Sequence, residues 1–176
     1  MARTAKTANR TARPAARRSA GRRPLLWLVV AVLVVGVAAG VTWYQARAGE
    51  QREAAARDAL AGATAAAQAL FSYDYRTFDA SVANGRSFAT GDFAKEYATT
   101  TGNLKSAAQT QHAVVRAQVS AVGVVRADTN EVELLVYLNQ YRSNVTITGE
   151  KVDQNRVRLT MVKVGGEWKV SKATAL

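Results

Sequence analysis

The sequence predicts an α+β domain carried on a single transmembrane helix, and three observations lead to this prediction. Leu25 to Tyr44 is a run of twenty residues without a charged side chain. Apolar residues recur at helical spacing from residue 48 to about residue 108, whereas strand-type alternation dominates after residue 110. Helices that precede a run of antiparallel strands are typical of helices packed on one face of a curved sheet.

The apolar run is long enough to cross a membrane. At about 1.5 Å per residue, twenty helical residues cover roughly 30 Å, the hydrocarbon thickness of a bilayer. Trp27 stands near its first end, and Trp43 and Tyr44 close the second, as interfacial anchors do. A cleaved signal peptide with a site at Ala46-Arg47-Ala48 is the alternative, but the run is longer than the roughly 7–15 residues of a signal h-region. We therefore expect residues 24–44 to be an uncleaved anchor.

The net charge of +11 is concentrated before the apolar run. Residues 1–23 hold 8 of the 24 basic residues and no acidic one, so the rest of the chain has a net charge of only +3. This tail lacks large apolar residues, and we expect it to be disordered. The positive-inside rule places the tail in the cytoplasm and residues 45–176 outside the cell membrane. The arginines next to the run are Arg17, Arg18, Arg22 and Arg23.

The basic tail has two possible partners. Attraction to anionic lipid headgroups contributes about 1 kcal/mol for each basic residue near the surface. Nucleic acid is the alternative, but the tail contains no aromatic residue that could stack on bases. We therefore expect the tail to bind lipid headgroups and not nucleic acid.

The first helix of the external part is expected over residues 45–72, as a stalk that runs into the domain. Its alanines and leucines at spacings of three and four predict one apolar face, made of Ala56, Leu60, Ala63, Ala67 and Leu70. Packing on its own domain is favoured over a coiled-coil dimer, because the seam is mostly alanine and covers only about two heptads. The sequence leaves open whether the protein forms a homo-oligomer.

Two shorter helices are expected to follow. Tyr75, Phe78 and Val82 indicate the second, and Asn84-Gly85 is expected to end it because these residues tolerate a positive φ. The third helix should start after Thr90 as its N-cap, carry Phe93 and Tyr97 on its apolar stripe, and end near Ala108.

About four antiparallel strands should complete the domain. The first covers the Val-rich stretch after residue 112, with a bulge or bend at Gly123, and the second starts near Val132 and extends as far as Ile147. "GEKVDQN" (residues 149–155) is predicted to be a turn, and Gly165-Gly166 a hairpin turn. Trp168 should point inward on the last strand.

The sequence offers little chemistry. It has no cysteine and one histidine, His112, so a conventional metal site would need a cluster of carboxylates, and none has suitable spacing. Neither a nucleophile motif nor a phosphate-binding loop is present. Asp74, Asp79 and the pair Asp92 and Glu96 are expected to be capping and surface residues. We predict no catalytic residue, no cofactor and no metal.

Four segments of the chain resemble a known family. They are "FSYDYRTFD" (residues 71–79), "TGDFAKEYATTTGNL" (90–104), "VVRAQVSAVGVVRAD" (114–128) and "VDQNRVRLTMVKVGGEWKVSKATAL" (152–176). Together with the Arg-rich tail, single span and Ala-rich helix, they resemble the Mce-associated membrane proteins of actinobacteria. The resemblance covers residues 45–176 and the topology, and the Ala- and Val-rich composition fits the same source.

The resemblance implies an NTF2-like cone over residues 73–176, with the stalk as its first helix. It implies a non-enzymatic accessory or scaffold protein whose partners are the subunits of an Mce-type lipid or sterol importer. A more distant resemblance is to the VirB8-type secretion scaffolds. Two alternatives stay open: a cone that binds a lipid or another small apolar ligand, and an enzyme with a buried acid in the cone. The residues expected to form the cone or its core are Tyr73, Phe78, Phe93, Tyr97 and Trp168.

Overall fold

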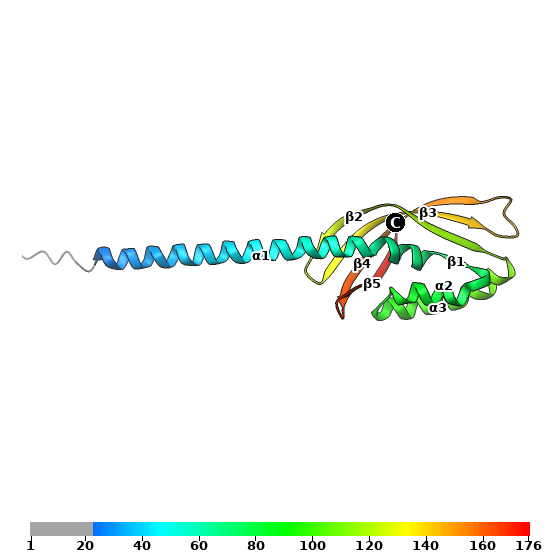
Figure 1. Ribbon diagram of the computed structural model, residues 1–176, viewed down its shortest axis with the longest axis horizontal. Coiled ribbons are helices and arrows are strands. Elements are labelled where there is room, and N and C mark those ends of the chain that lie inside the picture. Colours follow the sequence, from blue (N-terminus) through cyan, green and yellow to red (C-terminus); the bar gives the residue numbers. More distant parts are fainter. Residues whose placement is uncertain (1–22) are drawn as a thin grey trace, which may run out of the picture. The chain divides into compact units, whose positions relative to one another are not determined.

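The computed structural model describes residues 23–176 (Figure 1), and within residues 23–30 it describes the side chain of Trp27 alone. The chain divides into two compact units between Tyr44 and Gln45. The elements are α1 (Arg23–Phe71), β1 (Tyr73–Asp74), the 3-10 helix η1 (Tyr75–Thr77), α2 (Phe78–Ser87), α3 (Gly91–Thr110), β2 (Val114–Ala127), β3 (Glu131–Ser143), β4 (Lys151–Val164) and β5 (Glu167–Ala175).

The predicted α+β class is confirmed. The strands form one antiparallel sheet in the order β1-β2-β3-β4-β5, so each strand pairs with its neighbour in the chain. The three helices precede β2 to β5, and the part of α1 after Gln45 packs on the same face of the curved sheet as α3 (Figure 1). The sheet has one strand more than expected, because the two residues of β1 pair with Val114 and Val115. Two residues are too few to show a strand periodicity.

The main core lies between the sheet and α1. Alternate residues of β3 point to this face, and Leu134 lies opposite Leu159 of β4 in the strand register. The seven largest fully buried side chains all come from β3, β4 and β5: Val132, Leu134, Val136, Leu138, Leu159, Met161 and Val170. The side of α1 that covers them is made of alanines, which let the helix backbone lie close to the strands.

The buried face of α1 differs in part from the expected one. Ala63, Ala67 and Leu70 are buried as predicted, but Ala56 and Leu60 are only half-buried. In that half of the helix, the buried residues that face the sheet are Ala55 and Ala59, each one residue before the expected position. The small alanine side chains make the close contact here, and the larger Leu60 packs at its edge.

The expected end of the second helix is wrong. α2 begins at Phe78, because Tyr75 belongs to η1, and it continues through Gly85 to Ser87. Gly85 is a buried position inside the helix. A Cβ atom built on it would lie 2.2 Å from the Tyr97 hydroxyl oxygen and 2.8 Å from the Ala69 carbonyl oxygen. Glycine is therefore required by a close approach between helices and not by a helix end.

Three strand details are also corrected. The bulges of β2 lie at residues 120 and 125, while Gly123 pairs in register with Leu135. β3 ends at Ser143, before Ile147, because the side chain of Asn144 accepts hydrogen bonds from the backbone of residues 146 and 147 and closes a turn. β4 begins at Lys151, inside the "GEKVDQN" stretch. Its first residues are exposed on both faces, so their polar composition resembled that of a turn.

A hydrogen bond ties Ser72, the residue that follows α1, to the sheet. The backbone N–H of Ala117, a buried residue of β2, donates to the Ser72 hydroxyl oxygen over 2.8 Å. We expect Ser72→Ala to lower the free energy of unfolding by about 1 kcal/mol, because the amide loses its acceptor. Ser120→Ala is the matched control, since the Ser120 hydroxyl bonds an exposed carbonyl that water can reach. Urea unfolding of the full-length protein in detergent measures both, and equal effects would contradict the assignment.

Candidate functional site

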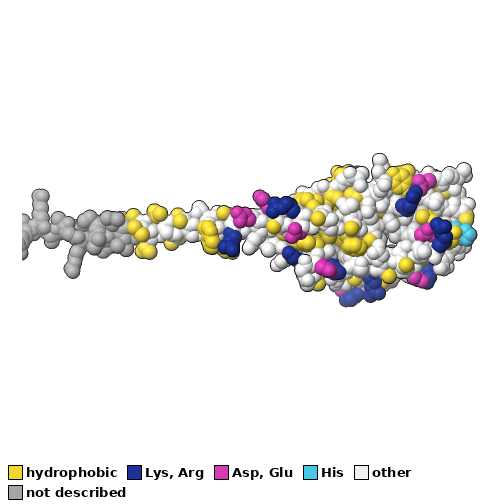
Figure 2. Space-filling model, in the orientation of Figure 1, with side chains coloured by type: hydrophobic (Ala, Val, Ile, Leu, Met, Phe, Trp, Pro, Cys, Tyr) yellow, Lys and Arg dark blue, Asp and Glu magenta, His cyan; other side chains and the backbone are white. Residues whose placement is uncertain are grey.

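The first part of α1 exposes an apolar surface. Val32, Leu33 and Val35 are all more than half exposed, and Trp27 and Tyr44 near its two ends are each 74% exposed. Figure 2 shows apolar side chains at the surface of this segment. Within the described part of the chain, one helix is long and apolar enough to cross a membrane, and none of its apolar window is buried. By length and composition, this helix is a candidate membrane anchor.

The structure describes only some of the residues expected at the anchor. Trp27, Trp43 and Tyr44 are exposed on α1. Leu25 and Arg23 belong to the helix, but their side chains lie outside the described residues, as do Arg17, Arg18 and Arg22 altogether. The lipid-headgroup role of the arginines is therefore still a prediction.

A pocket of about 480 Å³ lies in the domain, between the end of α1, helices α2 and α3, and the inner face of the sheet. Of the five residues expected to form the cone or its core, four line the pocket: Tyr73, Phe78, Phe93 and Tyr97. Trp168 does not line it. Trp168 packs against the main core, with its indole Nε1 buried and without a hydrogen-bond partner and the Lys163 ammonium 5.8 Å from its ring centroid.

Two aromatic pairs form opposite parts of the pocket wall. Phe93 and Tyr97 are four residues apart on α3, so both point to the same side, with ring centroids 6.3 Å apart. Tyr73 of β1 meets Phe78 at the start of α2 edge to face, at 5.5 Å. Helical spacing could predict the first pair. The second depends on β1 and η1, which the sequence does not indicate.

The pocket also has polar walls that the sequence analysis missed. Gln140 and Arg142 continue the inward-facing alternation of β3 beyond Leu138, and both line the pocket. Arg142 forms an ion pair with Asp153. Gln140 accepts a hydrogen bond from Asn155 over 2.7 Å. The available signal was two polar residues in the period-2 pattern of an otherwise apolar strand face.

Burial sets the protonation of the two pocket tyrosines. It raises the pKa of the Tyr73 hydroxyl, against the opposing effect of the positive charge of Arg142. Burial likewise raises the pKa of Tyr97. Both groups are therefore neutral hydrogen-bond donors at physiological pH. Glu96 is the carboxylate of the lining, and it is exposed, so the described pocket has no desolvated acid of the kind that serves as a general base.

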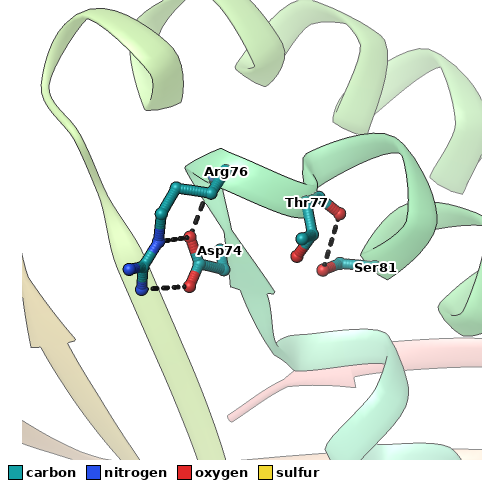
Figure 3. Close-up of polar contacts among 4 residues, drawn as sticks. All are labelled: Asp74, Arg76, Thr77 and Ser81. Carbon is teal, nitrogen blue, oxygen red and sulfur yellow. Dashed lines mark hydrogen bonds and ion pairs between the residues drawn. The ribbon is translucent and has the colours of Figure 1, made fainter.

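The carboxylate of Asp74 is bound by a neighbouring residue, Arg76. Figure 3 shows its carboxylate facing Arg76, which donates to it from Nε over 3.0 Å, from Nη2 over 2.7 Å and from its backbone N–H over 2.9 Å. These bonds from the Arg76 side chain, and then from its backbone, lower the pKa of Asp74. Asp74 is thus the N-cap of η1. Asp79 pairs with Lys105 at the surface, and no cluster of potential metal ligands occurs among the described residues.

Comparison with known proteins gives a distant relative and a fold. No family model matches this chain. An uncharacterized protein found in two strains of Mycobacterium tuberculosis is 29% identical over 150 residues, which cover 84% of this chain and 68% of the relative.

Three solved structures share the domain fold, each over 65% of this chain. The periplasmic domain of DotI matches with a TM-score of 0.55, 14% identity and 89% of its length covered. CagV, a VirB8 homolog of the Helicobacter pylori type IV secretion system, matches with a TM-score of 0.54, 10% identity and 93% of its length covered. An IcmL-like type IV secretion system protein of Legionella pneumophila matches with a TM-score of 0.53, 16% identity and 88% of its length covered. At these identities the likeness shows the fold, which is the VirB8-like form of the NTF2-like architecture.

Proposed function

We propose that this protein is a membrane-anchored, non-catalytic assembly subunit whose external domain docks on other subunits of a membrane complex. The observation that carries the proposal is the combination, in one chain, of an exposed apolar helix and a domain with the fold of secretion-system periplasmic domains. From the positive-inside rule, we propose that this domain lies outside the cell membrane.

The chemistry of the domain supports a non-catalytic role. Among the described residues, none of the buried side chains is polar or charged. Enzymes shift the pKa of a catalytic acid or base by burying it or by pairing it with charges. Glu96, the carboxylate at the pocket, is exposed instead. Burial raises the pKa values of the pocket tyrosines Tyr73 and Tyr97, which moves them further from neutral pH.

For the complex itself, we propose an Mce-type lipid or sterol importer. The sequence resemblance over residues 45–176 supports this, and the mycobacterial relative comes from an actinobacterium, as that resemblance implies. The fold neighbours support a second candidate, a complex of the type IV secretion kind. Both candidates assign the domain a docking role, and they differ in the partners that it would contact.

Crosslinking in the native membrane distinguishes these candidates. The full-length, tagged protein is treated with an amine-reactive crosslinker, which can reach exposed lysines such as Lys95 and Lys172. It is then purified under denaturing conditions, and the attached proteins are identified by mass spectrometry. We expect subunits of an Mce-type importer. Secretion-system subunits would support the second candidate.

The control keeps residues 1–44 and replaces residues 45–176 by an unrelated soluble domain. We expect this chimera to lose the crosslinked partners, because the proposal assigns docking to the external domain. Equal recovery of partners by the chimera, or the absence of any membrane-complex subunit with the intact chain, would contradict the proposal.

A further inference from the structure

The pocket occupies a gap between two separate hydrophobic clusters. Leu70 and Val157 on its wall belong to the main core, with Phe93 and Tyr97 packed against them. The opposite wall belongs to a second, smaller cluster, in which Tyr73, Val82 and Leu104 surround the buried Phe78. Protein interiors are normally packed like organic crystals, with few voids larger than a water molecule. A gap of about 480 Å³ with apolar walls is instead within the usual size range of ligand sites, roughly 300–1,000 Å³.

Most polar side chains around the gap are already satisfied within the protein. The Ser72 hydroxyl accepts a hydrogen bond from Ala117, and the Thr101 hydroxyl donates to the Tyr97 carbonyl over 2.7 Å. Gln140 is held by Asn155. An occupant therefore meets few free donors or acceptors. The hydroxyls of Tyr73, Tyr97 and Thr100 are donors of the lining for which the described residues provide no acceptor.

The charges around the gap do not favour a charged occupant. Arg142 is already paired with Asp153, and the exposed Glu96 adds a negative charge to the lining. A carboxylate inside the gap would lose hydration without gaining an unpaired counter-charge. An ammonium group would find only Glu96, which is exposed to solvent, where an ion pair contributes little. A peptide segment would bring backbone amides that the satisfied polar walls could not bond, at a cost of about 1–3 kcal/mol for each unpaired group.

We propose that this pocket binds an uncharged, mainly apolar small molecule that carries a hydrogen-bond acceptor, such as a long-chain alcohol, ketone or ester. The molecule fills the gap and joins the two clusters into one core, while a hydroxyl of the lining such as that of Tyr73 donates to its oxygen atom. This binding site does not depend on the proposed assembly role.

Photolabelling tests the site in the intact protein. The full-length chain in lipid nanodiscs is irradiated with a diazirine-bearing long-chain alcohol, and in parallel with the corresponding diazirine fatty acid. Adducts are mapped by mass spectrometry and normalised to labelling of the anchor helix, which faces lipid in both cases. We expect the alcohol to label residues 93–104, and the carboxylate to label them about tenfold less, the factor that corresponds to 1.4 kcal/mol of desolvation cost.

Two variants fill the gap from different helices, Leu104→Trp on α3 and Val82→Trp on α2. Each should reduce pocket labelling about tenfold, which corresponds to 1.4 kcal/mol of lost binding free energy, and leave anchor labelling unchanged. Ser106→Trp is the matched control, because Ser106 is exposed on α3 and does not line the pocket. Far-UV circular dichroism checks that each variant is folded. Labelling of the anchor without labelling of residues 93–104, equal labelling by both probes, or a partner protein crosslinked in the pocket would overturn the proposal.

Discussion

Gly85→Ala is expected to lower the free energy of unfolding by about 1–3 kcal/mol, although alanine is the better helix former by about 1 kcal/mol. The added methyl group would lie 2.8 Å from the Ala69 carbonyl oxygen, which is backbone and cannot rotate away, and 2.2 Å from the Tyr97 hydroxyl oxygen. α1, α2 or the Tyr97 ring must therefore shift. Because Tyr97 also lines the pocket, this change should disturb the pocket wall as well.

Gly102→Ala is the matched control for this prediction. Gly102 lies on α3, is exposed, and has nothing within 4 Å of the position of an added Cβ atom. We expect that substitution to raise the free energy of unfolding by up to about 1 kcal/mol through helix propensity alone. Adding Tyr97→Phe to Gly85→Ala should recover part of the loss, because it removes one of the two clashing oxygens. Urea titrations of the full-length chain in detergent measure all of these variants, and the same sign for Gly85→Ala and Gly102→Ala would refute the close-approach explanation.

The second prediction with a large expected effect concerns topology: a cysteine in the external domain should be labelled from outside the cell, and a cysteine in the basic tail should not. The chain has no cysteine, so one introduced cysteine is the only reactive thiol. In spheroplasts, Ser106→Cys on the exposed side of α3 should react with a membrane-impermeant maleimide. Ser19→Cys in the basic tail should react only after the membrane is permeabilised, because the arginines on either side of it favour the cytoplasmic face.

Detergent-solubilised protein provides the control for thiol reactivity, since both variants should label fully there. If Ser19→Cys labels in intact spheroplasts and Ser106→Cys does not, the orientation is the reverse of the proposed one. Labelling of a soluble fragment alone would instead indicate that the N-terminal segment is cleaved.

The sequence predicts those parts of the fold in which side-chain periodicity reflects burial. In β3, every second residue from Val132 to Leu138 is a large aliphatic residue that faces the core, and the structure confirms this strand. The first half of β4 has both faces exposed, so it carries no such pattern and was mistaken for a turn.

Gly85 shows a different limit of sequence reasoning. A glycine after Asn84 has the composition of a helix end, and only the tertiary contact with Ala69 and Tyr97 explains why it lies inside α2. The pocket shows the same limit. Phe93 and Tyr97 share a helix face that local spacing reveals, whereas Gln140 and Arg142 join them only through the sheet. Trp168 was expected in the cone or its core, and it packs against the main core and not at the pocket.

The central claim, that the anchored domain supports the assembly of a membrane complex, is tested most directly by deleting the gene and quantifying importer subunits in the membrane by mass spectrometry. We expect the amount of Mce-type subunits to fall several-fold. The full-length chain should restore it, and residues 45–176 without the anchor should not. Unchanged amounts of these subunits in the deletion strain would contradict the proposed role.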